Sequence, residues 1–166
     1  MVKYFERLSV NPTETKRLGE FLAKKITEEK GRKTLVFGLR GDLGGGKTTF
    51  LQGFAKGLGI KQKILSPTFL IMKRFGLKNS LIKQFSNFYH FDCYRIIKSK
   101  EILSLGFKTI ISDPKNIIAI EWADKVKKIM PKNTIWISFE FVDRNKRKIK
   151  IENKVLRLRN LARNKI

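Results

Sequence analysis

The chain has 166 residues, 42% of them apolar, which is enough for one folded domain with its own core. Its apolar stretches are too short to span a membrane, and the N-terminal sequence MVKYFERLSV lacks the apolar segment of a signal peptide. The single cysteine, Cys93, excludes an intrachain disulfide. We therefore expect one domain over residues 1–166, located in the cytoplasm, with no membrane contact.

The charge is strongly positive, with 37 Lys and Arg against 14 Asp and Glu and a formal net charge of +23. The densest stretch, residues 143–166, carries ten Lys and Arg and two acids. Two interpretations stay open: contact with nucleic-acid phosphates, or a lysine-rich composition spread over a solvated surface. Charge alone carries no readout of base sequence.

The first predicted elements are a helix, a strand and a second helix. The first helix is predicted to begin after Asn11, with Pro12 in its first turn, and to end at about Glu29. Residues 34–39 are β-branched and apolar, which is typical of a buried parallel strand. Apolar residues then repeat at helical spacing as far as Leu58, which predicts the second helix.

Between that strand and that helix, residues 41–48 read GDLGGGKT and fit the P-loop pattern G-x-x-x-x-G-K-[ST]. Glycines let consecutive backbone N–H groups turn toward phosphate oxygens, and the helix N-terminus adds the positive end of its dipole. Lys47 would place its charge near the outer phosphates, and the Thr48 hydroxyl can ligate Mg²⁺. The motif therefore predicts a nucleotide site.

The rest of the chain continues the alternation of strands and helices. The remaining predicted elements are strands at 69–75 and 85–92 joined by a turn at 76–80, a short helix at 99–105, a buried strand at 116–121, a helix at 123–129, and strands at 134–141 and 146–151. Together they predict an α/β fold of the P-loop NTPase type. Its central sheet should be mostly parallel, with some antiparallel strands, and flanked by helices.

Two acids stand at the ends of predicted strands. Four apolar residues precede Glu121, the form of a Walker B strand, which delivers a carboxylate to the metal or to its water shell. Asp92 ends an aromatic strand and could hold a Mg²⁺-bound water or orient the attacking water. We interpret His90 as a core residue and Cys93 as a small buried apolar residue, whereas Trp122 fits equally a site wall or the core.

Residues 66–68, Ser-Pro-Thr, place hydroxyl groups on a constrained turn soon after the second helix. GTPases use such a place for a threonine that senses the γ-phosphate, although the same tripeptide also forms ordinary turns. The chain has no Asn-Lys-x-Asp element for guanine, which disfavours a GTPase.

Five segments, taken together, resemble the TsaE (YjeE-type) family, bacterial P-loop ATPases of tRNA threonylcarbamoyladenosine biosynthesis. The matching segments, in the family's order, are GDLGGGKTTF (41–50), SPTF (66–69), YHFDCYR (89–95), EILSLGF (101–107) and EW (121–122). The resemblance covers nearly the whole chain. It implies an ATPase that works with ATP or ADP and Mg²⁺ beside the TsaD and TsaB proteins, and it leaves room for tRNA contact through the basic surface.

The same resemblance implies roles for individual residues. Thr48 and Glu121 would ligate Mg²⁺, and Lys47, Asp92 and Glu121 would act in catalysis. Thr13, and Lys146 or Arg147, correspond weakly to residues that border the nucleotide. The residues implied to bind the nucleotide are Gly41, Asp42, Leu43, Gly44, Gly45, Gly46, Lys47, Thr48 and Thr49.

Two departures from the family pattern concern the loop and the surface. Gly45 stands where alanine is common, which should loosen the loop in its unbound state. Lys73 and Arg74 stand in a stretch that is often acidic in relatives. Two other functions remain as alternatives: a small P-loop kinase that phosphorylates a metabolite, and a nucleic-acid-binding module that does not hydrolyse ATP.

Overall fold

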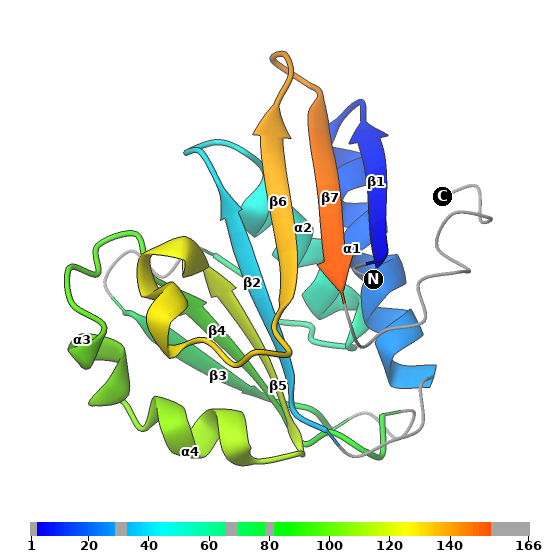
Figure 1. Ribbon diagram of the computed structural model, residues 1–166. Coiled ribbons are helices and arrows are strands. Elements are labelled where there is room, and N and C mark those ends of the chain that lie inside the picture. The colour runs from blue at the N-terminus through cyan, green and yellow to red at the C-terminus, as the bar shows by residue number, and fades with distance from the viewer. Residues whose placement is uncertain (1–2, 29–32, 66–69, 79–81, 154–166) are drawn as a thin grey trace.

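The computed structural model describes residues 3–28, 33–65, 70–78 and 82–153, and these carry one twisted sheet with helices on both faces (Figure 1). The strands are β1 (Lys3–Ser9), β2 (Leu35–Gly41), β3 (Met72–Gly76), β4 (Asn87–Asp92), β5 (Asn116–Glu121), β6 (Ile135–Phe141) and β7 (Arg147–Asn153). The helices are α1 (Pro12–Glu28), α2 (Lys47–Gly57), α3 (Lys100–Leu103), α4 (Phe107–Ser112) and the 3₁₀ helix η1 (Ala123–Ile129).

The sheet has the order β1-β7-β6-β2-β5-β4-β3. Its centre is parallel, because β2 pairs in parallel with β5 and β6, and β4 pairs in parallel with β5. Both edges are antiparallel, through the pairs β1–β7, β6–β7 and β3–β4. The predicted fold class is confirmed. The parallel centre brings the carboxyl ends of β2, β5 and β4 to one edge of the sheet, where such folds place their ligands.

Strand β5 explains why the sheet is covered on both faces. All six of its residues are buried, and successive side chains point to opposite sides. Ile117 and Ala119 join the hydrophobic cluster under α1 and α2, whereas Ile118 and Ile120 join the cluster under α3, α4 and η1 (Figure 1). The strand is thus fixed from both sides, and Glu121 at its end is held in place by the core.

Helices α1 and α2 pack closely side by side on one face of the sheet. Glycines make this approach possible, because a Cβ atom at Gly53 would overlap the carbonyl oxygen of Lys16, and one at Gly19 would overlap that of Phe50. Phe54 of α2 packs edge-on against Phe37 of β2, with ring centroids 5.1 Å apart. These contacts fix the axis of α2 and, with it, the position of the loop that precedes it.

Most predicted elements are present, with shifted ends. The strand expected at 69–75 covers Met72–Gly76, and the one expected at 146–151 covers Arg147–Asn153. The helix expected at 123–129 is a 3₁₀ helix, with non-helical backbone angles at Val126. Within the described ranges, no helix is both long and apolar enough to cross a membrane.

Two elements were not predicted, β1 and α4. In β1, Phe5 and Ser9 point into the protein while Tyr4 and Leu8 remain exposed, so the apolar pattern does not mark the buried face. Its place in the sheet comes from pairing with β7, a strand almost 150 residues away in the sequence. In α4 the described core contact is Phe107, which packs edge-on against Phe91 of β4 at 5.5 Å.

Candidate nucleotide and metal site

The glycine-rich loop, residues 42–46, connects the end of β2 to the start of α2 in the order that the motif predicts. Gly41 has φ 138°, and a Cβ atom there would overlap the carbonyl oxygen of Phe139 on the neighbouring strand β6. Gly46, with φ 96°, lies in the left-handed region directly before α2. Both positions require glycine for backbone reasons, which accounts for part of the motif without reference to a ligand.

Lys47 begins α2 and folds back over the loop. Its Nζ donates hydrogen bonds to the carbonyl oxygens of Gly41 at 2.5 Å and Asp42 at 2.7 Å, and it lies 3.8 Å from the ring centroid of Trp122. The residue is only 4% exposed. Burial lowers the pKa of Lys47, and nearby carboxylates, Glu121 first among them, act in the opposite direction. The amine is therefore held inside the loop by neutral acceptors that an anion could replace.

Thr48 and Glu121 meet across the site. The Thr48 hydroxyl, on the first turn of α2, donates to the Glu121 carboxylate, with Oγ1 2.9 and 3.0 Å from its two oxygens. Glu121 lies at the end of β5 with a side chain only 3% exposed. A buried carboxylate is costly unless donors surround it, so this contact ties the loop to the strand.

His90 supplies the second donor to Glu121. Its Nε2 lies 2.9 Å from Glu121 Oε1, and the imidazole is 1% exposed. An ionised Glu121 carboxylate only accepts hydrogen bonds, so it requires the tautomer of His90 with the proton on Nε2. The prediction that His90 is buried is confirmed. Its side chain nevertheless contacts the site, which sequence reasoning missed.

The spacing of two residues between His90 and Asp92 could have predicted that His90 lies near the site. Side chains two residues apart on a strand point to the same face, so His90 and Asp92 share one face of β4. Strand β4 runs parallel to β5 with Asp92 in register with Glu121. The sequence alone does not show that β4 and β5 are neighbours. Without this pairing, the spacing of His90 and Asp92 does not predict a contact with Glu121.

Asp92 lines the same cavity as Lys47, Thr48 and Glu121. Its Oδ1 accepts the backbone N–H of Tyr94 at 2.9 Å, which holds the carboxylate at the end of β4. The Tyr94 ring packs on Trp122, with centroids 5.1 Å apart, and Lys125 donates to the Tyr94 carbonyl. Trp122 is partly exposed in a left-handed conformation with φ 57°, so it forms a wall of the site.

These groups enclose a cavity of about 230 Å³. Its lining consists of Leu43, Gly44, Gly45, Gly46, Lys47, Thr48, Thr49, Asp92, Tyr94, Glu121 and Trp122. The structure thus brings together the predicted residues of the loop and both strand-end acids. Gly41 and Asp42 contribute differently, through the carbonyl oxygens that hold Lys47.

The donor set fits a magnesium–nucleotide ligand. The described residues contain no group of three or more His, Cys, Asp and Glu that could hold a metal ion without help. A hydroxyl and one carboxylate beside a glycine loop suit Mg²⁺, which keeps several waters and takes further ligands from phosphates. Thr48 and Glu121 are the residues that would hold it.

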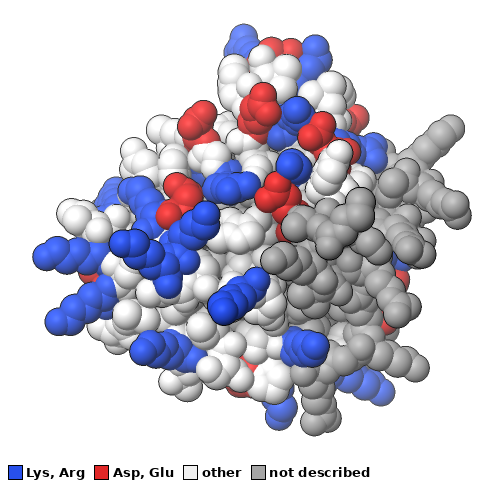
Figure 2. All heavy atoms as spheres, in the orientation of Figure 1, with Lys and Arg blue, Asp and Glu red and all other residues white. Residues whose placement is uncertain are grey.

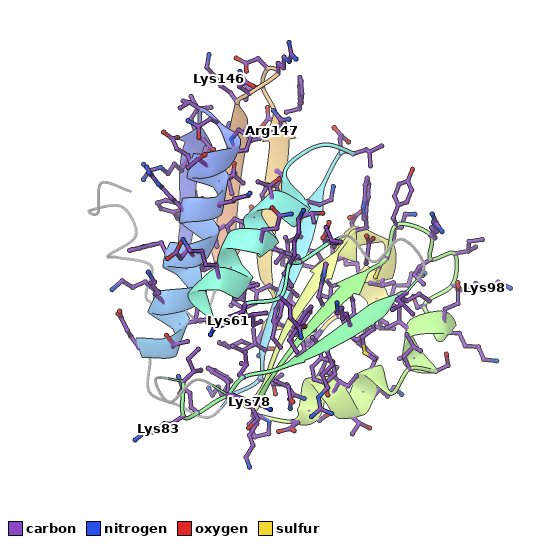
Figure 3. All side chains as sticks on the ribbon, turned by 180° about the vertical axis from the view of Figure 1, so that it is seen from behind. Lys61, Lys78, Lys83, Lys98, Lys146 and Arg147 are labelled. Atoms are coloured by element: carbon purple, nitrogen blue, oxygen red, sulfur yellow. The ribbon has the colours of Figure 1, made fainter. Side chains whose placement is uncertain are left out.

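Arg147 links the end of the β6–β7 hairpin to the loop. Its Nη2 and Nε donate to the Gly44 carbonyl oxygen at 2.9 and 3.2 Å, and its guanidinium lies 4.6 Å from the Phe141 ring centroid. The neighbouring Lys146 instead pairs with Asp143 at 3.0 Å (Figure 3 labels Lys146 and Arg147). Of the two residues that the resemblance suggested, Arg147 is the one that contacts the loop.

Other expectations at the site have different outcomes. Thr13 is exposed at the start of α1 and does not line the cavity; the methyl group of the buried Thr15 instead approaches Gly46. The Ser-Pro-Thr-Phe segment at 66–69 lies outside the described residues. Cys93 is buried as predicted, and burial raises the pKa of its thiol to about 12.

The parallel centre of the sheet and the loop between β2 and α2 define an α/β protein of the P-loop NTPase type. Residues 9–149 match the family described as threonylcarbamoyl adenosine biosynthesis protein TsaE, and the chain belongs to this family.

Similar proteins from several bacteria agree with this membership. A protein of Bacillus subtilis named tRNA threonylcarbamoyladenosine biosynthesis protein TsaE is 32% identical over 148 residues, 89% of this chain and 85% of the relative. One of the same name from Haemophilus influenzae is 31% identical over 128 residues, 77% of this chain and 74% of the relative. The crystal structure of Bacillus subtilis YdiB superposes with a TM-score of 0.67 at 29% identity, covering 92% of this chain and 87% of that one.

Proposed function

We propose that this protein is a Mg²⁺-dependent ATPase that acts as an accessory subunit, with TsaD and TsaB, in the biosynthesis of threonylcarbamoyladenosine in tRNA. Family membership and the names of its relatives support the pathway. The observation that carries the ATPase is the direct contact of Thr48 with Glu121, in the cavity that Lys47 also lines. A glycine turn with an incidental lysine would not need a buried carboxylate at this place.

The roles follow from the positions of the side chains. The N–H groups of the loop and of the first turn of α2 would bind the phosphates, and Lys47 would exchange its two carbonyl partners for phosphate oxygens. The Thr48 hydroxyl can keep donating its hydrogen bond to Glu121 while its oxygen offers a lone pair to the cation, because a hydroxyl both donates and accepts. When bound, Mg²⁺ neutralises phosphate charge during transfer.

Asp92 would orient the attacking water. Its Oδ1 is held by the Tyr94 N–H, and the residue lines the same cavity as the loop. A carboxylate so placed can accept a proton or a hydrogen bond from a water near the outer phosphate. Further groups could come from a partner protein, since P-loop enzymes often complete their sites in trans.

The proposal is tested by ATP hydrolysis of the purified chain alone and with TsaD and TsaB from the same source. We expect slow turnover alone and clear stimulation by the pair, with Lys47→Ala lowering both rates. Stimulation that requires a small metabolite and yields its phosphorylated form would instead identify a kinase. Tight nucleotide binding without turnover in the presence of both proteins would reject the ATPase.

A further inference from the structure

A hollow lined by basic residues runs beside α2, from the middle of this helix to the end that is remote from the loop. It consists of two adjoining depressions of about 600 and 900 Å³ that share residues 59–62 as a common wall. We call this surface the basic hollow. In Figure 3, Lys61 and Lys78 mark it at the end of the molecule opposite to Lys146 and Arg147. The larger depression extends along α2 as far as Gln52, but neither depression shares a lining residue with the nucleotide cavity.

The charged residues of the hollow come from three separate parts of the chain. Helix α1, the segment after α2, and strand β3 with the residues that follow it contribute exposed cations. They are Lys16, Arg17, Lys61, Lys63, Arg74 and Lys78. No ion pair within the described residues joins any of these six to a carboxylate. Their charges are therefore directed at solvent from several sides of one depression.

The hollow contains little that would neutralise these cations. Among the described lining residues Glu20 is the one acid, and it already pairs with Lys24 at 2.8 Å and Lys56 at 3.0 Å. The Nε of Arg74 donates to the neutral amide oxygen of Asn87, which fixes the guanidinium and leaves its charge uncompensated. Repulsion among fixed like charges is relieved when an anion binds.

The positive charge of the chain is not spread evenly. On β1, β6, β7, the β6–β7 turn and the neighbouring strand β2, cations pair with acids. The pairs are Arg40–Glu152, Lys150–Glu152, Lys146–Asp143, Lys148–Glu6 and Lys148–Glu140. Figure 2 shows Lys and Arg side chains mingled with Asp and Glu over the β6–β7 hairpin at the top of the view. The hollow thus differs from a surface that is basic merely by composition.

The chemistry of the hollow favours a phosphate backbone over a protein surface. Protein interfaces have an apolar or aromatic centre, but none of the exposed large apolar side chains of the described residues lines the hollow. Nucleic-acid backbones need only well-spaced cations and an open groove. We propose that the basic hollow binds the phosphate backbone of RNA, and that the RNA is the transfer RNA on which the modification pathway acts.

This inference rests on the proposed function for the identity of the RNA, but its site is separate from the nucleotide cavity. Because the hollow and the nucleotide cavity have no lining residue in common, RNA and nucleotide can be bound together. Phe75, the one aromatic residue among the described lining residues, is only 4% exposed, so the hollow would position the RNA through its phosphates and not select its sequence by base stacking.

The test measures binding of a transfer-RNA transcript by fluorescence anisotropy between 50 and 200 mM salt. The double variant Lys61→Glu/Lys78→Glu is compared with Lys98→Glu/Lys108→Glu, which makes the same change of charge at exposed lysines beyond the other face of the sheet. At 0.1 M salt we expect the hollow variant to lose roughly 10- to 100-fold in affinity and about two phosphate contacts in its salt dependence. The control should lose less than about threefold, because exposed charges beyond a Debye length are screened.

Nucleotide affinity, measured on the same samples, separates this inference from the proposed function. We expect it unchanged in both variants, whereas failure of the ATPase proposal would appear in the wild-type chain without any RNA. Equal losses of RNA affinity in the two variants would overturn the inference in favour of general surface charge. Unchanged RNA affinity with loss of stimulation by TsaD and TsaB would overturn it in favour of a protein contact.

Discussion

The two ends of helix α2 use charged side chains in opposite ways. Lys47 at its first residue is 4% exposed and bonded to loop carbonyls, whereas the side chain of Lys56 near its last turn is 75% exposed and forms an ion pair on the surface. At the first end every charge has a partner within the cavity walls. At the second end, around the basic hollow, most cations of the described residues form no ion pair with a carboxylate.

This difference has consequences for selectivity. A buried, fully bonded cluster recognises its ligand by geometry, because any displaced group leaves an unsatisfied partner in a medium of low dielectric constant. Exposed cations recognise charge density, and salt weakens them. Substitutions at the nucleotide cavity should therefore depend on atomic detail, whereas those at the hollow should depend on the number of charges.

The largest expected effect is on turnover. Asp92→Asn keeps the size of the side chain and removes its charge, so the attacking water loses its acceptor. We expect ATP hydrolysis in the presence of TsaD and TsaB to fall by roughly 10²–10⁴-fold, with nucleotide affinity little changed. Asp113→Asn is the matched control, because Asp113 lies outside the cavity and its Oδ1 likewise accepts the backbone N–H of the second residue after it, Lys115. Equal rates for wild type and Asp92→Asn would remove Asp92 from the catalytic set.

A smaller effect is expected on binding. Lys47→Ala removes a charged donor from the loop, and a hydrogen bond to a charged group contributes about 1.5–3 kcal/mol, or roughly 10- to 150-fold in affinity. Isothermal titration with ADP and Mg²⁺ measures it. Lys56→Ala, on the same helix but outside the cavity, should bind ADP like the wild type. Unchanged affinity in Lys47→Ala would refute the phosphate site.

The smallest expected effect concerns His90 as a positioning residue for Glu121. The amide nitrogen of His90→Gln can reach the place of Nε2, whereas that of His90→Asn is too short to reach Glu121. We expect His90→Asn to reduce the enhancement of nucleotide affinity by Mg²⁺ about fivefold, since one hydrogen bond contributes about 1 kcal/mol, and His90→Gln to retain most of it.

The melting temperatures of the two His90 variants control for stability. Both variants introduce an amide in the same buried place. If His90 only stabilised the fold, the enhancement of nucleotide affinity by Mg²⁺ would therefore fall equally in both variants. Equal Mg²⁺ enhancement in both variants would mean that the orientation of Glu121 does not depend on this contact.

Much of the fold could be predicted because its local signals are strong. The pattern of residues 41–48 fixed the order of strand, loop and helix, and the uniform burial of β5 was apparent from its apolar run. The edges of the sheet were harder. The inward face of β1 combines Phe5 with the polar Ser9 and so carries no apolar periodicity, and only pairing with β7 makes it a strand.

The site divides in the same way. The spacing of the glycines, the lysine and the threonine within eight residues was apparent from the local sequence, whereas the overlap that requires glycine at Gly41 involves Phe139 on the neighbouring strand. Tertiary structure decided that β4 lies beside β5, and therefore that His90 contacts Glu121 and that Asp92 and Glu121 open on one cavity. It also brought Arg147 to Gly44 and gathered the cations of the basic hollow from three distant segments. Such contacts join residues far apart in the chain, and the packing of the whole sheet, which no local pattern encodes, determines them.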